Sequence, residues 1–252
     1  MTAAALLAAL DLPAAARVDK RVPKKLMLEN GAPTAADKRL INDGIEELFW
    51  LASLKPGNSG VAAYWDEARE YLEIAVLRML LRPDANALRL LELLQRAVPY
   101  PLLVLFERGA GSGMCAAHKR WSLAESGKTV LDGDLITVSF DGGAAGDFWP
   151  VFCEALPIGR QPHATLYALY QGWLDALLAV QAARITGSFS IAADGGRAAG
   201  RRTALRECAR LQAEAGGLRA AAERETQLAR RVELNCELKS MEARLAVERT
   251  KL

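Results

Sequence analysis

Hydrophobic and polar positions repeat with different periods along the chain, and these periods predict its elements. Behind Thr34, a typical helix N-cap, apolar residues recur at helical spacing and share one face: Leu40, Ile41, Ile45 and Leu48. A clearer helix is expected over residues 85–97, with the shared face Leu88, Leu91, Leu94 and Val98. Residues 1–12 are rich in Ala and Leu and predict a short docking helix.

Short runs of bulky apolar residues predict strands at 49–54 and 102–106, each next to a turn that contains proline. The run 71–81 alternates poorly, so we interpret it as a strand buried on both faces, with a helix as the open alternative. Residues 109–113 are rich in glycine and predict a hairpin turn into an antiparallel strand over 114–122. Two further strands are expected at 129–131 and 135–140.

The second half of the chain has a different pattern. Residues 141–162 are rich in Gly and Pro and are expected to form a loop, whereas 165–183 carry an amphipathic helical stripe. Residues 194–200 have the composition of a flexible linker. The sequence therefore predicts an α+β fold in three parts: a mixed sheet with flanking helices (1–140), a loop with an amphipathic helix and linker (141–200), and a C-terminal coiled-coil helix (201–252).

The C-terminal tail interleaves charges of both signs and contains no proline. Its apolar residues step by three and four, which is the spacing that keeps one seam facing a partner helix. The expected seam is Leu211, Leu218, Leu234, Leu238, Met241 and Leu245. Gly216, Gly217 and Glu225 interrupt the pattern, so two helical segments are expected. The seam predicts dimerisation or docking on another protein, and the alternative is a helix folded back on its own domain.

Composition narrows the range of functions. The 252 residues carry a net charge of only +2, and half of them are apolar. The overall charge therefore does not indicate binding to nucleic acid or to a membrane surface. The N-terminal apolar run has no basic residue before it and no long apolar stretch follows, so a cytoplasmic protein without membrane contact is expected. Four widely spaced Cys and two His make a metal site improbable, and no cofactor is expected.

Two sets of basic residues are candidates for binding nucleic acid. The first is a basic segment at 17–25, and its charged members are Arg17, Lys20, Arg21, Lys24 and Lys25. The alternative for this segment is an edge strand whose charges prevent pairing with another sheet. The second set is Lys119 and Arg120, next to His118. Strand alternation predicts that His118 and Arg120 share one face, and that Trp121 enters the core with Lys119 on its side.

Four acids raise the hypothesis of a metal-dependent nuclease: Glu70, Glu73, Asp132 and Asp134. None of them is followed by a Lys at the spacing of such enzymes, and residues 132–134 have the composition of a tight turn. No catalytic residue is assigned, and the expectation leans towards a protein that is not an enzyme.

An ordered set of short strings resembles a known family. The strings are residues 21–25, 41–47, 54–56, 98–101, 117–120 and 231–238. In this order they resemble the bacterial family catalogued as domain of unknown function 4391. The resemblance implies an accessory protein of the kind encoded beside DNA methyltransferases and large helicases of restriction or phage-defence clusters. We therefore expect a non-enzymatic adaptor whose partner is such a helicase or methyltransferase, or a second copy; the alternatives are a nucleic-acid-binding accessory and a divergent nuclease.

Overall fold

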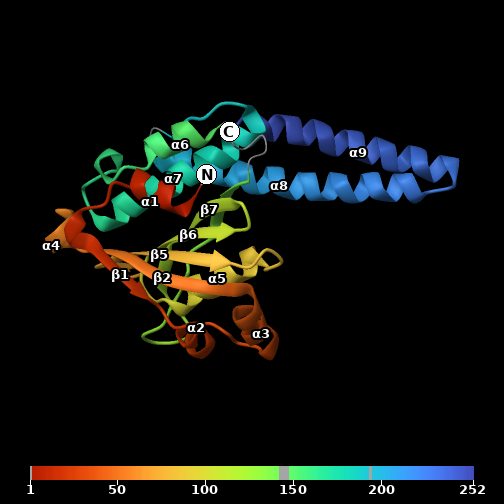
Figure 1. Ribbon diagram of the computed structural model, residues 1–252. Coiled ribbons are helices and arrows are strands. Elements are labelled where there is room, and N and C mark those ends of the chain that lie inside the picture. The colour runs from red at the N-terminus through yellow and green to blue at the C-terminus, as the bar shows by residue number, and fades with distance from the viewer. Residues whose placement is uncertain (1, 142–147, 193–194) are drawn as a thin grey trace. The chain divides into compact units, whose positions relative to one another are not determined.

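The computed structural model describes residues 2–141, 148–192 and 195–252 (Figure 1). It divides into two compact units, Met1–Leu177 and Leu178–Leu252. The first unit contains a mixed β-sheet with helices, and the second is helical, so the predicted α+β class is confirmed. No helix in the described ranges has the length and apolar character needed to cross a membrane.

The central sheet has the strand order β1-β2-β5-β6-β7-β10. The strands are β1 (Arg17–Arg21), β2 (Ile45–Leu54), β5 (Ile74–Leu81), β6 (Leu102–Arg108), β7 (Gly111–Ala116) and β10 (Ile136–Phe140). Only the β5–β6 pair is parallel, and every other neighbouring pair is antiparallel. The strand interpretation of residues 71–81 is confirmed for Ile74–Leu81, which is buried on both faces as expected.

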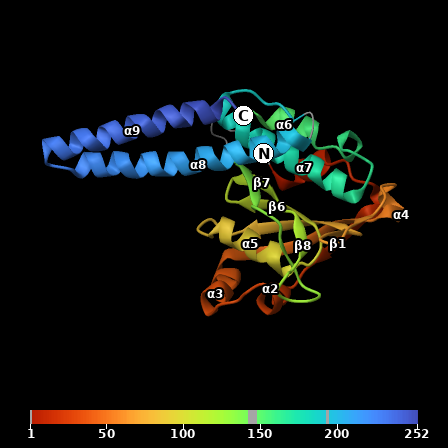
Figure 2. The same ribbon diagram turned by 180° about the vertical axis from the view of Figure 1, so that it is seen from behind.

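The parallel pair requires a crossover, and α5 (Ala87–Ala97) supplies it. Its N-cap is Asn86, whose side chain accepts from the Arg89 backbone N–H at 3.2 Å. Leu90, Leu91, Leu93 and Leu94 of this helix pack against alternate residues of β5 and β6 in one core cluster. The predicted face was partly wrong, because Leu88 is 63% exposed. Figure 2 shows α5 covering this face of the sheet.

Two short helices complete this side of the sheet: α2 (Lys25–Asn30) and α3 (Ala35–Gly44). Thr34 is the N-cap of α3, as predicted, and accepts from the Asp37 backbone N–H at 3.1 Å. The expected continuation of this helix to Leu48 was wrong, because Ile45 already begins β2. Ile45 is β-branched and Phe49 and Trp50 are aromatic, which suits a strand, and pairing with β5 overrides the helical spacing.

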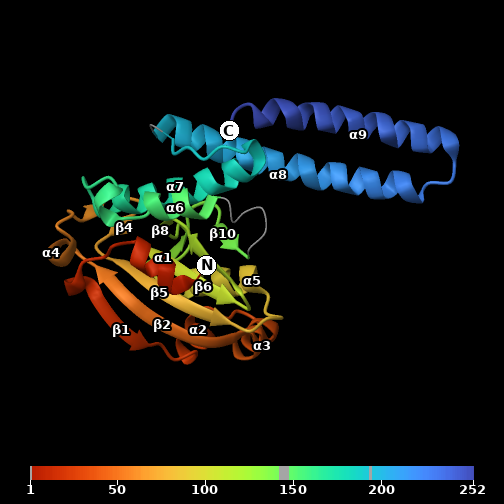
Figure 3. The same ribbon diagram turned by 45° about the horizontal axis from the view of Figure 1, so that its top comes forward.

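The opposite face of the sheet is covered by α1 (Ala3–Ala9), α6 (Trp149–Ala155) and the first part of α7 (Leu166–Thr186), as Figures 1 and 3 show. The predicted N-terminal helix is confirmed, with Leu6 and Leu10 fully buried. The helix over 165–183 is also confirmed. The expected loop over 141–162 was wrong for α6 and for the 3-10 turn Ile158–Arg160; residues 142–147 lie outside the described part.

Two small hairpins and one short helix, α4 (Pro56–Ser59), lie outside the central sheet. One hairpin pairs β3 (Tyr64–Trp65) with β4 (Glu70–Tyr71), and the other pairs β8 (Lys119–Trp121) with β9 (Thr129–Leu131). The turn after β6 and the antiparallel partner β7 are confirmed. A single strand over 114–122 was wrong, because the chain leaves the sheet after Ala116 and resumes as β8 in another sheet.

The second unit contains the end of α7, then α8 (Gly195–Arg224) and α9 (Leu228–Arg249). The expected linker over 194–200 was wrong for residues 195–200, which begin α8; Asp194 lies outside the described residues. The two helical segments expected in the tail are present, and the break falls at residues 225–227, where Glu225 interrupts the apolar pattern. The break expected at Gly216 and Gly217 was wrong, because both residues continue α8. The short connection turns the chain back, so α8 and α9 form a hairpin (Figure 1).

Candidate functional site

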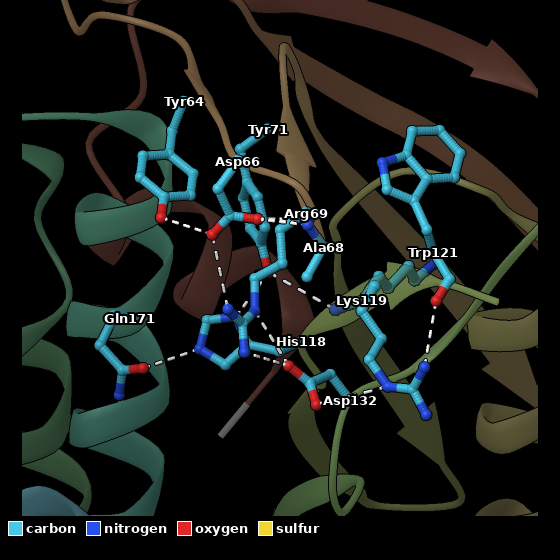
Figure 4. A network of polar contacts seen from close by, with 11 residues as sticks. Tyr64, Asp66, Ala68, Arg69, Tyr71, His118, Lys119, Trp121, Asp132 and Gln171 are labelled. Atoms are coloured by element: carbon cyan, nitrogen blue, oxygen red, sulfur yellow. Dashed lines mark hydrogen bonds and ion pairs between the residues drawn. The ribbon is translucent and has the colours of Figure 1, made fainter. Parts of the chain in front are cut away.

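A chain of polar contacts is centred on His118, where the backbone passes from β7 to β8 (Figure 4). The Tyr71 hydroxyl lies 2.5 Å from His118 Nδ1, and Gln171 Oε1 lies 2.7 Å from His118 Nε2. Because an amide oxygen only accepts, Nε2 carries the proton and Nδ1 accepts from Tyr71. Gln171 in turn donates from Nε2 to Asp175 Oδ1 at 2.7 Å. We call Tyr71, His118, Gln171 and Asp175 the His118 network.

Aromatic rings enclose the His118 network. Tyr167 stacks on the imidazole with centroids 4.9 Å apart, and Tyr64 stacks on Tyr167 at the same separation. Burial raises the pKa of Tyr71 and of Tyr170 well above the usual range, so both phenols keep their protons. The Tyr170 hydroxyl donates to Leu102 O at 2.8 Å and accepts from the Ala117 N–H at 3.1 Å. These bonds hold the backbone at the point where β7 ends.

An ion pair lies beside these rings and joins the two small hairpins. Arg69 donates to Asp132 Oδ2 from Nε at 3.0 Å and from Nη2 at 2.7 Å, and its guanidinium lies 5.8 Å from the Tyr167 ring centre. Asp66 accepts from the Tyr64 hydroxyl at 2.7 Å and from the Arg69 backbone N–H at 2.6 Å. The pKa of Asp66 is lowered, first by the Tyr64 hydrogen bond. This cluster fixes β3–β4 against β8–β9.

Lys119 is the least expected side chain of the region. It is 3% exposed, so it is not available for the phosphate binding that the nucleic-acid hypothesis gave it, and its ammonium donates to the carbonyl of Val98. Desolvation lowers its pKa to about 7. It lines a pocket of about 350 Å³ with Glu70, Glu73, Tyr100, Arg120 and Trp121 among others. A buried amine held by one carbonyl is suited to anchoring the turn after α5.

Alternation does not hold over residues 118–121. His118 and Lys119 are both buried, while Arg120 and Trp121 are half-buried. Arg120 donates to Trp121 O at 3.1 Å and lies 3.8 Å from Asp132, so it faces acceptors of the protein itself. The expectation that Trp121 enters the core was wrong. The strand break after Ala116 resets the alternation, which runs evenly only along continuous strands.

The basic segment lies on an edge of the central sheet. Arg17, Lys20 and Arg21 are exposed on β1, Lys25 is exposed at the start of α2, and Lys24 is half-buried. Lys24 donates to Asn42 O at 3.1 Å, and Lys25 lies 3.5 Å from Glu29. Arg21 lies 3.7 Å from Glu47, and a hollow of about 430 Å³ is lined by basic and acidic residues together. The segment is thus partly neutralised by neighbouring acids.

The backbone of β1 is irregular. Asp19 has a φ of 48°, and the register with β2 shifts between Arg17 and Lys20. Lys119 and Arg120 belong to β8 in a different sheet, so the two basic sets do not share one strand surface. An edge strand, the alternative interpretation of this segment, is confirmed.

Three of the four acids of the nuclease hypothesis have separate roles, and the fourth, Asp134, is exposed between β9 and β10. Asp132 pairs with Arg69, and Glu73 lies 3.0 Å from Lys55. Glu70 pairs in the β3–β4 hairpin, opposite Trp65. Within residues 2–141, 148–192 and 195–252, no group of three or more His, Cys, Asp or Glu is arranged to hold a metal ion.

The residues of the expected tail seam face one another across the α8–α9 hairpin. Leu211 and Leu245 pack with Cys208 in one buried cluster, which Met241 and Leu252 border. Leu234 is also buried, whereas Leu218 and Leu238 are half-buried. Two ion pairs cross the hairpin: Arg219 lies 3.0 Å from Glu242, and Arg244 lies 3.6 Å from Glu207. The seam therefore has a partner helix within the same chain.

Together these features define an α+β protein with a buried His–Tyr network and a C-terminal helical hairpin. A family model described as a domain of unknown function, DUF4391, matches residues 10–245. The chain belongs to this family, which confirms the resemblance seen in its sequence. No curated protein and no solved structure matches the chain.

Proposed function

We propose that this chain is a non-enzymatic, cytoplasmic accessory protein that acts through protein–protein contacts in a restriction-modification or phage-defence system. Its partner is a helicase or a DNA methyltransferase of the same cluster. The observation that carries the proposal is the α8–α9 hairpin, in which two long helices pack against each other through one narrow apolar seam. Outside this seam both helices also present many charged residues of both signs to solvent.

A helical hairpin of this kind is better suited to binding another protein than to catalysis. Charged residues on helix faces steer association and select partners, because unlike charges must meet and like charges are rejected. Arg210 and Glu214 on α8, and Arg230 and Glu233 on α9, are ion pairs with both members well exposed. Such pairs add little to folding stability and are therefore free to re-pair with a partner.

The test is co-expression of the affinity-tagged chain with the helicase and the DNA methyltransferase encoded beside it. Exchanging Arg230 with Glu233 (R230E with E233R) keeps an i,i+3 pair but reverses its polarity, and the Arg210–Glu214 pair can be exchanged in the same way. We expect at least one exchange to reduce the captured partner about tenfold, a loss of about 1.4 kcal/mol. The control exchanges Lys25 with Glu29 on α2, an exposed i,i+4 pair in the other unit.

Two results would reject the proposal. One is that neither candidate protein is retained by the unmodified chain. The other is that retention is undiminished by both exchanges and by truncation before Glu225, which removes α9. Circular dichroism of each exchange variant checks that the helices persist.

A further inference from the structure

A second apolar stripe runs along α9, on the side that faces away from α8. Its members are Leu228, Val232, Cys236, Ala243 and Val247, spaced by four, four, seven and four residues. This spacing keeps them on one side of a helix. Leu228 is 68% exposed, Val232 is 53% exposed and Val247 is 59% exposed. The stripe is thus separate from the seam that joins α9 to α8.

The separation of the two stripes follows from helical geometry. Val232 and Leu234 are two residues apart, which places them roughly 200° apart around the helix axis. Leu234 and Leu245 are buried in the hairpin, so the stripe at Val232 and Val247 lies on the opposite side of α9. Three large or medium apolar side chains on a solvent-facing helix side have no partner in the described part of the chain. An apolar row flanked by charges is typical of a helix–helix contact.

The order of residues along the stripe is nearly palindromic about a point between Glu237 and Leu238. Reversing the helix about this point places Leu228 opposite Val247 and Val232 opposite Ala243. A surface that matches its own reversed copy fits a two-fold interface, in which the same patch is used on both subunits. Lys239 and Cys236 then meet near the axis. A polar residue inside such a seam fixes the register at some cost in stability.

The flanking charges agree with the same reversal. In an antiparallel pair related by a two-fold axis, each flank of the stripe faces the same flank of the other copy. Reversal then brings Glu233 close to Arg244 on one flank. On the other flank it brings Arg231 close to Glu242. Each of these pairs is of opposite sign and occurs twice by symmetry.

We propose that this outer face of α9 is an interface with a second copy of the same chain, packed antiparallel about an axis near Glu237 and Leu238. The charged residues currently make exposed contacts within one chain, such as Arg230 with Glu233 at 2.7 Å, and exposed pairs of this kind exchange at little cost. The stripe is short and partly made of Ala, so the contact is weak and concentration-dependent. It has a different partner from the adaptor role, although both proposals involve Glu233, and it does not depend on that role.

The first test is the molar mass of the full chain by light scattering and sedimentation velocity, from about 1 µM to about 100 µM. We expect the mass to rise towards twice the monomer value. Val232→Glu and Val247→Glu should each hold the chain at the monomer mass, because a charge in the stripe is desolvated in the dimer. Leu123→Glu is the matched control, since Leu123 is 93% exposed in the other unit.

A second test concerns orientation. Glu233→Arg should weaken self-association by repelling Arg244 of the second copy, and adding Arg244→Glu should restore it. A chain that stays monomeric at the highest concentration, or a dimer that survives Val232→Glu with its helicity intact, would overturn the interface. Failure of the double variant to recover association would overturn the antiparallel packing. No defence-system protein is present in these measurements, so their outcome is separate from that of the adaptor proposal.

Discussion

Lys119 occupies an environment that disfavours its charge. The side chain is 3% exposed and desolvation lowers its pKa from 10.5 to about 7, while its amine still donates to the Val98 carbonyl. Below about pH 7 the lysine is protonated in both the folded and the unfolded chain. Burial of the charged ammonium then lowers the free energy of unfolding by its full desolvation penalty. Between about pH 7 and about pH 10 only the unfolded chain holds the proton. Raising the pH across this window therefore stabilises the folded state.

This behaviour predicts a pH-dependent difference between the protein and its Lys119→Met variant. The free energy of unfolding of the unmodified chain should rise relative to the variant by up to about 1.4 kcal/mol per pH unit above about pH 7. Urea titrations at several pH values measure the difference, in which all other titrating groups cancel. Lys128→Met, at a well-exposed lysine of the same hairpin, should show no such trend. Parallel pH curves for the chain and the Lys119 variant would show that the amine stays charged.

The hydrogen-bond partners of His118 could not be predicted from the sequence pattern. His118 was visible in the sequence beside Lys119 and Arg120, but Tyr71 lies 47 positions before it and Gln171 lies 53 positions after it. No spacing rule connects residues that only the sheet and α7 bring together. Tyr71 was interpreted as part of a buried strand and Tyr170 as part of a helical stripe, so their burial was predictable. Their hydroxyl partners were not.

At the scale of elements, some glycines have open space around them, whereas others are required because a side chain would not fit. Gly216 and Gly217 lie inside α8, and a Cβ at either position would meet open space. Glycine in a helix interior is less favourable than alanine by about 1 kcal/mol. We therefore expect Gly216→Ala and Gly217→Ala each to stabilise the hairpin by about 1 kcal/mol, measured by thermal unfolding followed at 222 nm, the usual helix band.

Gly113 is the contrasting control. A Cβ there would lie 2.3 Å from both the Phe106 ring and the Val138 carbonyl oxygen. Gly113→Ala should therefore lower the free energy of unfolding by more than Gly216→Ala or Gly217→Ala raises it. If the α8 substitutions lower the stability instead, the helix bends at the two glycines, which is where the heptad pattern alone would place a break.

Most elements were predictable because their apolar periods are strong, and the errors cluster where two signals compete. Ile45 continues the helical spacing of α3 but is β-branched, and the pairing of β2 with β5 decides in favour of the strand. The helix α6 was missed because Pro150 and the surrounding glycines suggest a loop, although proline is well tolerated in the first turn of a helix. Gly195–Gly200 was interpreted as a linker for the same compositional reason, yet it starts α8.

At the scale of the whole molecule, the core cluster of the sheet is larger than the cluster that joins α8 and α9. The first unit has a core cluster that includes residues of β5, β6 and α5, whereas the cluster between α8 and α9 has three buried members, Cys208, Leu211 and Leu245. Segments with few buried contacts open at lower free energy than core strands. The hairpin is therefore expected to open locally while the sheet stays closed.

Hydrogen exchange followed by mass spectrometry tests this expectation. Amides of β5 and β6 should exchange most slowly, and Leu245→Ala should speed exchange along α8 and α9 without changing β5 and β6. The cost of such a truncation is about 2–5 kcal/mol in a tight core and less at a narrow seam. Glu223→Ala, on the exposed side of α8, should leave the hairpin unchanged. Faster exchange of the sheet in the Leu245 variant would mean that the two units unfold as one.

The irregular edge strand β1 has a consequence for how this protein can assemble. A regular, uncharged edge is a template on which further strands can be laid without limit, and fibrils grow in this way. In β1 the left-handed Asp19 and the register shift disturb the ladder, and Arg17, Lys20 and Arg21 surround it with positive charge. This end of the sheet is thereby closed to templated growth. Contacts between helices join a fixed number of copies, so they allow this protein to form larger complexes without open-ended strand addition.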